Sequence, residues 1–515
     1  MTARPLIAGA VVVLLALALR LALLHSARFG GDEALFFGIA SDIVDGKSFP
    51  LLGTQITDGQ GRLPGPAFLY VIAIQLLIAR APEAQYAFVE ILGAFTVGVF
   101  WHALRRPFGE RAALFAGVLM ALSPWSALYA DRTWNPNVLP LVVMLALLAA
   151  IRLRTDPASP WLAAFLPLCA VMPQFHMSAP VAWAGLVVIA WPVARSWTAG
   201  RAWRDRRSRR HLAVGVALSA LLYVPLAVHE AKTGFGNTAA IIAETVGNKE
   251  RFPTSFLWVP VYALRFLTLD VTYHELSGYW GGPDEVACLK AAVFGSRPRP
   301  FHPLRLLAMT SSLALALAAL AVLVRSARAR IGDTRVYAWA FAAALVTNVA
   351  FIGLSGKQVF GHYVTNMFPF AFVAYAALGA ALFARGPDPR TRLARLSVLA
   401  LAAIFCVGGV EATLAISARV DGRIGLRVHR ETLEKIDADA KREHLENDPV
   451  RLDFGYFSSL YDWSAFASRA MNLKIRFDKR SKTRAYRLVE KDHPLADGAF
   501  TEGPIDVGYA LLYRL

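Results

Sequence analysis

The sequence predicts an all-α polytopic membrane protein with about 11 transmembrane helices, juxtamembrane helices in its outer loops and a small C-terminal α+β domain. Hydrophobic residues make up 56% of the 515 residues, charged residues make up 18%, and the mean hydropathy is +0.44. This balance is too apolar for a soluble chain of several domains. Apolar runs long enough to span about 30 Å of hydrocarbon recur as far as residue 416, after which the chain becomes polar.

The first apolar run, residues 5–25, is similar to a secretory signal but is long and has no small-x-small cleavage site before Gly30. We therefore expect it to stay in place as the first span. Ten more runs are predicted to span, near residues 85–104, 111–129, 136–152, 160–174, 178–195, 212–229, 303–324, 336–354, 363–384 and 396–416.

The apolar run 64–80 is excluded from the spans on grounds of charge. Counting it would invert every later helix and place the arginine-rich stretch 195–211 outside, against the positive-inside rule. We expect 64–80 to be a helix lying at the outer surface instead. The inner loops are then 105–111, 152–159, 195–211, 325–335 and 384–395.

The charge distribution agrees with this topology. Arg4 and the inner loops hold 21 Lys and Arg against 5 Asp and Glu, whereas the outer loops 26–84 and 230–302 hold 11 against 13. The net charge of +17 is therefore explained by membrane orientation, and no nucleic acid partner is expected. The expected location is a bacterial-type inner membrane, with the outer loops on the periplasmic or extracellular side.

Residues 417–515 differ in pattern from residues 1–416, which form the predicted transmembrane domain. A polar helical stretch, ETLEKIDADAKREHLE, is followed by the alternating runs VRLDFGYF, AYRLVEK and VGYALLYRL. Such a mixture predicts a small α+β domain on the outer side.

No motif indicates a metal or a nucleotide. The three cysteines, Cys169, Cys288 and Cys406, lack metal-ligand spacing, and HExxH, GxGxxG and GxxxxGK[ST] patterns are absent. The cofactor is therefore unknown, with a divalent cation left open.

Two adjacent acids, Asp32 and Glu33, follow the first span at the outer mouth of the membrane. A carboxylate there is suited to act as a general base that takes the proton of an acceptor hydroxyl. An Asp before apolar residues is also typical of a helix cap, and spacing alone favours the cap.

From the first span to about residue 150 the chain resembles the GT-C superfamily of membrane glycosyltransferases, in particular the protein-mannosyltransferase and aminoarabinose-transferase-like group called glycosyltransferase family 39. The resemblance rests on the order of span, DE with a surface helix, GRLPGPAFLYVIA, a span ending RRPFGERAALFAG, and ALSPWSALYADRTWNPNVLP. It implies that Asp32 is the catalytic base and Glu33 its neighbour. Members of the family often carry a charged residue or His before a Pro-Pro or Lys-Pro turn, whereas this chain has Arg62 before LPGP. We suggest that Arg62 contacts the donor phosphate, because a guanidinium binds two phosphate oxygens at once.

Further outer-facing residues are candidates for substrate binding. Two of them, Asp131 and Arg132, lie in YADRTWNPN. Asp131 either positions the acceptor or binds a divalent cation, or it forms an ordinary loop ion pair with Arg132. His176, in MPQFHMS, is either a substrate ligand or a structural interfacial histidine.

The segment SGKQVFGHYVTNMFP resembles the late family motif of a basic residue, then HY or RY, then a proline. The resemblance implies that Lys357 and His362 neutralise the leaving lipid phosphate, with Tyr363 beside them. Interfacial Lys, His and Tyr are also common in membrane proteins without such a role. Inside the spans, Arg20 and Glu90 lie at similar depth and are predicted to pair.

These features predict an inverting glycosyltransferase that moves a sugar from a polyprenyl-phosphate-linked donor to an acceptor hydroxyl on a glycan, lipid or protein. Membrane lipid is the other expected partner. The alternatives are a transporter or flippase of lipid-linked sugars, which predicts inverted repeats and polar residues near the bilayer centre, and a non-catalytic scaffold.

Overall fold

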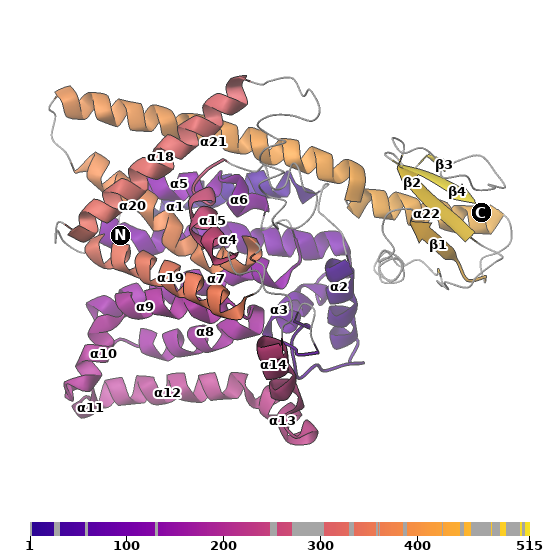
Figure 1. Cartoon of the computed structure of the whole chain (residues 1–515), viewed down its shortest axis with the longest axis horizontal. Helices are drawn as coiled ribbons and strands as arrows, with labels where there is room; N and C mark the ends of the chain where they lie inside the picture. Colours follow the sequence, from indigo (N-terminus) through magenta and orange to yellow (C-terminus); the bar gives the residue numbers. More distant parts are fainter. Residues whose placement is uncertain are drawn as a thin grey trace.

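The computed structural model describes residues 3–24, 31–56, 60–128, 132–247, 255–269, 303–328, 334–356, 359, 361–384, 389–424, 426–442, 448–454, 475, 485–490, 505–506 and 510–514. Most of these residues form a bundle of helices (Figure 1). In chain order the described helices are α1 (Ala3–Leu21), α2 (Gly31–Val44), α3 (Ala67–Leu76), α4 (Pro82–Phe108), α5 (Glu110–Ala121), α6 (Pro124–Leu128), α7 (Asn135–Thr155), α8 (Trp161–Phe175), η2 (Ala179–Val181), α9 (Ala182–Ile189), α10 (Trp191–Thr198), α11 (Arg201–Arg204), α12 (Arg206–Leu222), α13 (Val224–Thr233), α14 (Gly236–Gly247), η3 (Ser255–Leu257), α15 (Trp258–Arg265), α18 (Pro303–Arg328), α19 (Thr334–Ser355), η4 (Gly361–Met367), α20 (Phe368–Phe383), α21 (Pro389–Ile424) and α22 (Leu426–Arg442).

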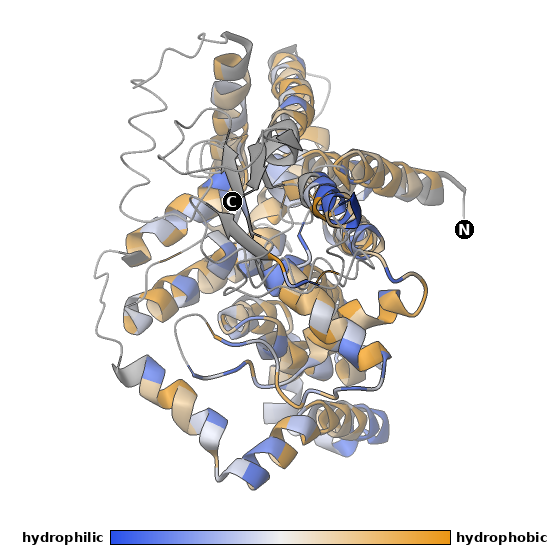
Figure 2. Ribbon diagram, turned by 90° about the vertical axis from the view of Figure 1, so that its right-hand side faces the viewer, coloured by the Kyte–Doolittle hydropathy of each residue, from blue (hydrophilic) through white to orange (hydrophobic). Residues whose placement is uncertain are grey.

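The helices have the length and composition of a multi-pass membrane protein. Within the described residues, 6 helices are long and apolar enough to cross a membrane, or up to 8 when each of two bent pairs counts as one span. Hydrophobic residues predominate along the bundle helices (Figure 2). The predicted total of eleven spans therefore stays a prediction. Helix α3, in the run excluded from the spans, has 10 residues and is about 15 Å long, too short to cross hydrocarbon.

Three of the predicted spans are interrupted. The span expected over 178–195 is bent by 69° between α9 and α10, and that over 212–229 by 44° between α12 and α13. Pro192 and Pro225 are the second residues of α10 and α13, where the missing N–H and the ring prevent a straight continuation of the preceding helix. The span expected over 111–129 breaks before Pro124 in the same way. Hydropathy predicted the position of these segments in the sequence but not the angle between the two helices of each segment.

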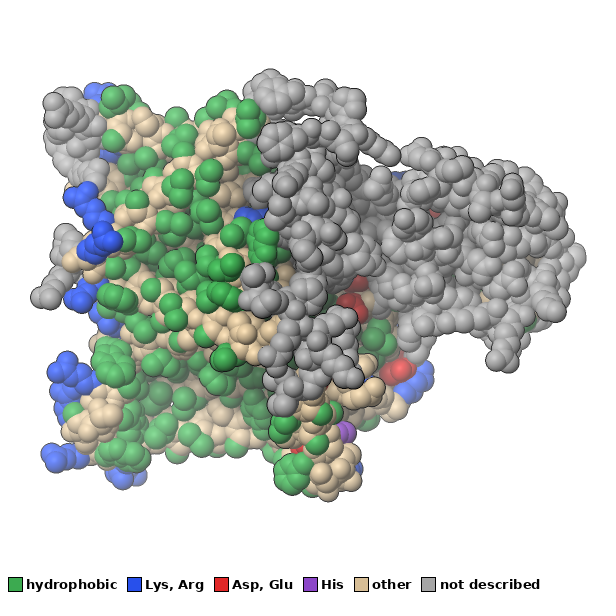
Figure 3. Space-filling view, viewed as in Figure 1, with side chains coloured by type: hydrophobic (Ala, Val, Ile, Leu, Met, Phe, Trp, Pro, Cys, Tyr) green, Lys and Arg blue, Asp and Glu red, His purple; other side chains and the backbone are tan. Residues whose placement is uncertain are grey.

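Basic residues gather at one end of the bundle. Lys and Arg side chains line one edge in Figure 3, and a largely hydrophobic surface extends away from that edge. The last turns of α4, α7 and α18 each end in arginines, and α10 and α11 lie at this end too (Figure 1). Helices α2, α3 and α14 lie at the opposite end. We call these the basic end and the α2 end.

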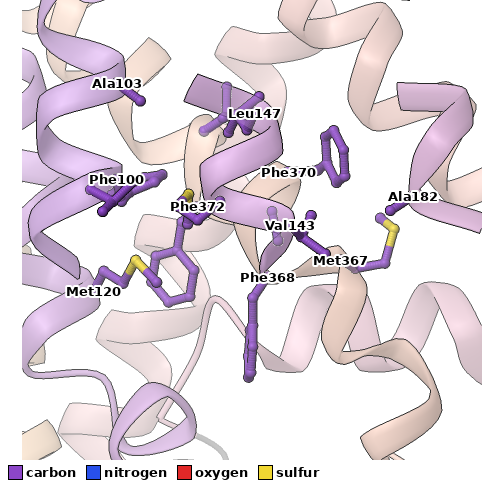
Figure 4. Packing of buried hydrophobic residues seen from close by; sticks show 14 of the residues in the cluster. Phe100, Ala103, Met120, Val143, Leu147, Ala182, Met367, Phe368, Phe370 and Phe372 are labelled. Carbon is purple, nitrogen blue, oxygen red and sulfur yellow. The ribbon is translucent and has the colours of Figure 1, made fainter. Parts of the chain in front are cut away.

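The bundle core is built around α20. Side chains of this helix interdigitate with those of α4, α5 and α7, as Phe100, Met120, Val143 and Phe372 show (Figure 4). Tight packing of this kind replaces a hydrophobic driving force between helices in lipid. Gly379 allows a close approach, because a Cβ there would lie 3.0 Å from Cα of Ala112.

The predicted pairing of Arg20 with Glu90 is confirmed. Nε of Arg20 lies 4.0 Å from Oε2 of Glu90, with side chains 0% and 2% exposed. The guanidinium also donates to the carbonyl and the hydroxyl oxygens of Ser126, at 2.8 Å each. Arg20 thus joins α1 and α4 to α6 and to the end of α5, where it donates to the carbonyl oxygen of Ala121 at 3.3 Å.

Toward the C-terminus, α21 is longer than the span that the sequence predicted. It continues to Ile424, beyond the predicted limit at 416, because the polar stretch that follows is still helix-compatible. Helix α22 covers the start of the predicted polar helix. Four short strands follow, in the order β1-β2-β4-β3, with β1 parallel to β2 and the other pairs antiparallel. They are β1 (Arg451–Phe454), β2 (Ala485–Glu490), β3 (Ile505–Asp506) and β4 (Ala510–Arg514).

Candidate active site

The two adjacent acids of the first outer loop have different surroundings. Helix α2 begins at Gly31, so Asp32 and Glu33 both lie in its first turn. Successive residues of a helix point about 100° apart. Asp32 is exposed, whereas Glu33 is 1% exposed. The first turn of a helix has unpaired N–H groups and a positive dipole end, which stabilise carboxylates and phosphates there.

Glu33 is bound by an arginine from a distant part of the chain. Nε of Arg132 donates to Oε1 of Glu33 at 2.6 Å, and the guanidinium lies over the ring of Trp134, 4.5 Å from its centroid. The carbonyl of Arg132 accepts from Nδ2 of Asn137 at 3.2 Å. Charge-assisted bonds of this length are the stronger kind. Arg132 is therefore held between α2 and the segment that precedes α7.

Trp134 begins a group of four rings that we call the His–aromatic cluster: Trp134, His176, His362 and Tyr363. The centroids of Trp134 and His362 are 4.5 Å apart, and those of His362 and Tyr363 are 4.4 Å apart. His176 completes the cluster at 5.7 Å from His362 and 5.3 Å from Tyr363. Three segments far apart in sequence thus meet beside the Glu33–Arg132 pair.

Ser178 connects two members of this cluster. Its hydroxyl donates to the carbonyl oxygen of Tyr363 at 2.6 Å and lies 2.8 Å from Nδ1 of His176. A hydroxyl has one proton and a carbonyl oxygen only accepts, so His176 is the donor in the second bond. The Ser178 N–H also approaches Nδ1 at 3.2 Å, but the two shorter contacts decide the tautomer. His176 then presents the lone pair of Nε2.

Burial determines the protonation state of His176. It lowers the pKa of His176 to about 4, because a charged imidazolium would lose its hydration. The ring is therefore neutral at pH 7 and able to accept a hydrogen bond from a sugar hydroxyl at Nε2.

Buried polar residues fix η4, which carries His362 and Tyr363. Asn366 donates from Nδ2 to the carbonyl of Ser178 at 3.1 Å, and its Oδ1 accepts from Asn348 of α19 at 3.0 Å. Thr365 donates to the carbonyl of His362 at 3.1 Å. Asn348, Thr365 and Asn366 are each 0% exposed. Buried amides with partners hold one geometry, since leaving them unpaired would be costly.

Arg62 contacts a different element. Its N–H donates to Oδ1 of Asn237 at 2.8 Å and its carbonyl accepts from Nδ2 of the same residue at 3.1 Å, so the loop is attached to α14. Its side chain is exposed. The same loop is packed on Gln174, since a Cβ at Gly65 would lie 2.2 Å from Cδ of Gln174.

Of the nine predicted site residues, the structure brings together Glu33, Arg132, His176, His362 and Tyr363, with Asp32 adjacent to Glu33. Asp131 and Lys357 lie outside the described residues. Sequence analysis missed Trp134 and Ser178. The run ADRTWNPN places Trp134 two residues from Arg132, a cation–aromatic spacing that could have indicated it. In the part of the chain that the structure describes, no group of three or more His, Cys, Asp or Glu is arranged to hold a metal ion.

Comparison with known proteins identifies the fold. No family model matches the sequence, and no curated protein matches it. The structure of ArnT from Cupriavidus metallidurans bound to undecaprenyl phosphate is similar to this chain with a TM-score of 0.59 and 16% identity, covering 98% of this chain and 97% of that one. The apo structure of the same ArnT gives a TM-score of 0.55 and 15% identity over the same shares.

Proposed function

Because the chain has the fold of the GT-C superfamily of membrane glycosyltransferases, we infer that this protein is an inverting glycosyltransferase with a polyprenyl-phosphate-linked sugar donor. The acceptor is a hydroxyl group of a glycan, lipid or protein. The ArnT structure holds undecaprenyl phosphate, which supports a donor of this lipid-linked kind. The observation that carries the proposal is the arrangement at the start of α2, where exposed Asp32 adjoins the buried Glu33–Arg132 pair.

Asp32 is the better placed of the two acids to act as general base. Oε1 of Glu33 forms an ion pair with Arg132, and the Glu33 side chain is buried and therefore inaccessible to an acceptor. Asp32 is exposed in the first turn of α2, where an acceptor hydroxyl can approach. In the proposed step Asp32 takes the hydroxyl proton, the oxygen attacks the anomeric carbon, and the bond to the lipid phosphate breaks on the opposite face, which inverts the configuration.

The remaining candidates have roles in holding the donor. The faces of Trp134 and Tyr363 are suited to the apolar face of a sugar ring, and His176 is suited to accept from one of its hydroxyls. Arg132, His362, Lys357 and Arg62 are proposed to stabilise the phosphate that departs, an electrostatic task for which fixed cations and donors are effective. Asp131 is proposed to position the acceptor.

The proposed membrane arrangement places these residues on the outer face of an inner membrane. The positive-inside rule assigns the basic end to the cytoplasm and the α2 end to the periplasmic or extracellular side. We propose residues 1–416 as the transmembrane domain, with eleven spans, and residues 417–515 as an outer α+β domain. The described strands and α22 support the second part of this division.

The test is transfer of radiolabelled sugar from polyprenyl-phosphate donors in membranes that contain equal amounts of wild type or Asp32→Asn. We expect the variant to lower the transfer rate by at least about 100-fold, since a general base contributes roughly that much or more. Asp42→Asn is the matched control, because it removes a carboxylate from the same helix about three turns further along.

Each outcome is informative. Equal rates in wild type and Asp32→Asn would show that Asp32 only stabilises the start of α2. If wild type consumes no donor, the transferase assignment fails, and uptake of the same lipids across vesicles would then test the transporter alternative.

A further inference from the structure

A group of arginines at the basic end is not used by the proposed reaction. Arg105 and Arg106 lie in the last turn of α4, and Arg152 lies in the last turn of α7. The two helices pack along each other, and both end among the basic side chains at the edge of the molecule (Figures 1 and 3). We call Arg105, Arg106 and Arg152, together with His102, the arginine cluster.

A hydrogen bond inside this cluster leaves its positive charge uncompensated. Nη2 of Arg152 lies 3.0 Å from Nε2 of His102. A guanidinium only donates, so Nε2 must accept, and His102 is a neutral imidazole with its proton on Nδ1. Arg152 thus donates a hydrogen bond to a neutral partner, and its positive charge is not neutralised.

The helix ends do not balance the arginines either. Among the described residues, Arg105, Arg106 and Arg152 form no ion pair with a carboxylate. A helix C-terminus has the equivalent of roughly half a negative charge, so two termini offset about one of the three positive charges. An excess of about two positive charges remains, and an anion is the group that would compensate it.

A partly exposed tryptophan, Trp161, indicates the level of the cluster relative to the membrane. The guanidinium of Arg152 lies 6.0 Å from the ring centroid of Trp161, and that of Arg105 lies 5.2 Å from that of the buried Trp101. Tryptophan is enriched at the headgroup level, where lipid phosphates are found. Arg106 is exposed and Arg152 is half-buried, so a phosphate can reach both.

We propose that the arginine cluster binds the phosphate of an anionic phospholipid in the leaflet at the basic end. Guanidinium groups suit this ligand, because their planar N–H groups bind two phosphate oxygens at once. The site is separate from the candidate active site, which lies at the α2 end of the bundle. Its role is to anchor the ends of α4 and α7 to the headgroup layer.

The test uses the full chain purified in detergent, titrated with phosphatidylglycerol, phosphatidylcholine or inorganic phosphate, with thermal stability and native mass spectrometry as readouts. We expect phosphatidylglycerol alone to bind and to raise Tm. Arg152→Gln and Arg106→Gln should each weaken its apparent Kd by about fivefold, the contribution of one arginine near a membrane surface. Arg204→Gln is the matched control, because it removes an exposed charge from α11 at the same end.

Arg106 is exposed in the last turn of α4, so Arg106→Gln still tests the proposal even if loss of the His102 contact unfolds Arg152→Gln. Equal binding by wild type, Arg106→Gln and Arg204→Gln would overturn the proposal, as would equal binding of phosphatidylcholine. If inorganic phosphate binds with the same dependence on Arg106 and phosphatidylglycerol does not, the site takes free phosphate and the lipid assignment is overturned.

Discussion

Nε of Arg132 donates to Oε1 of Glu33 across 2.6 Å, and this bond joins residues 99 positions apart in the chain. It connects the first turn of α2 to the segment before α7, with Trp134 stacked on the guanidinium. The bond therefore fixes the place of the neighbouring Asp32 relative to the His–aromatic cluster.

Removing Arg132 should leave a buried carboxylate without its partner. We expect Arg132→Gln to lower the free energy of unfolding by about 3 kcal/mol, the usual cost of breaking one side of a buried ion pair. Thermal unfolding in detergent measures this. The double variant Glu33→Gln with Arg132→Gln should lose much less than the sum of the two single variants. Additive losses would mean that the pair does not stabilise the fold.

The lowered pKa of His176 predicts how stability depends on pH. Its folded pKa is about 4, below the ordinary value of 6.5, so between these values the unfolded chain binds more protons. Stability from this residue is complete above pH 6.5 and decreases as pH falls toward 4, by roughly 3 kcal/mol in total. Unfolding of wild type and His176→Asn from pH 4 to 7.5 should show a shallower pH dependence in the variant. Identical slopes would contradict a buried neutral histidine.

Ser178→Ala should separate positioning from stability. Loss of the hydroxyl removes its bonds to Tyr363 and His176, while Asn366 still donates to the Tyr363 carbonyl at 3.1 Å. We expect a stability loss of about 1 kcal/mol and a several-fold higher KM for the donor. Thr413→Val is the control, because it removes a buried hydroxyl that donates at 2.7 Å inside α21, away from the site. An equal change of KM in both variants would rule out the positioning role.

Any side chain at Gly409 is predicted to collide with neighbouring backbone and lower the stability of the fold. A Cβ at this position would lie 2.2 Å from the carbonyl oxygen of Leu122, which belongs to the backbone at the break between α5 and α6. We expect Gly409→Ala to destabilise the protein by about 1–3 kcal/mol. Gly353→Ala, where the nearest atom is 3.7 Å away, should be neutral or slightly stabilising. Thermal unfolding of both variants in detergent distinguishes the two environments.

Sequence analysis located the helices well because apolar runs and arginine-rich loops are local signals. Every predicted span has a helix in its range, and the run 64–80, which was expected to form a helix at the outer surface, contains the 10-residue helix α3. The 69° bend between α9 and α10 was not predicted, although Pro192 was visible. Hydropathy averaged over a window does not depend on direction, so a proline within an apolar run does not indicate the angle.

The site shows a similar limit. The residue types could be predicted, and so could their position at the end of the bundle opposite the basic residues, since motifs and charge distribution are properties of the sequence. The partner of Glu33 could not, because it depends on the rotation of α2 about its axis and on where the segment before α7 lies in space. A rotation of α2 by one residue would have presented Asp32 to Arg132 and left Glu33 exposed. Trp134 was missed for the same reason, as its contacts come from η4.

Helix α21 has 36 residues and is therefore about 54 Å long, well beyond the thickness of the hydrocarbon core. Beyond its end, Arg430 of α22 forms an ion pair with Glu83 at the start of α4. This ion pair connects the helix that leads into the C-terminal strands with the first turn of α4, so the strands follow from the end of the bundle at which α4 begins rather than from its basic end.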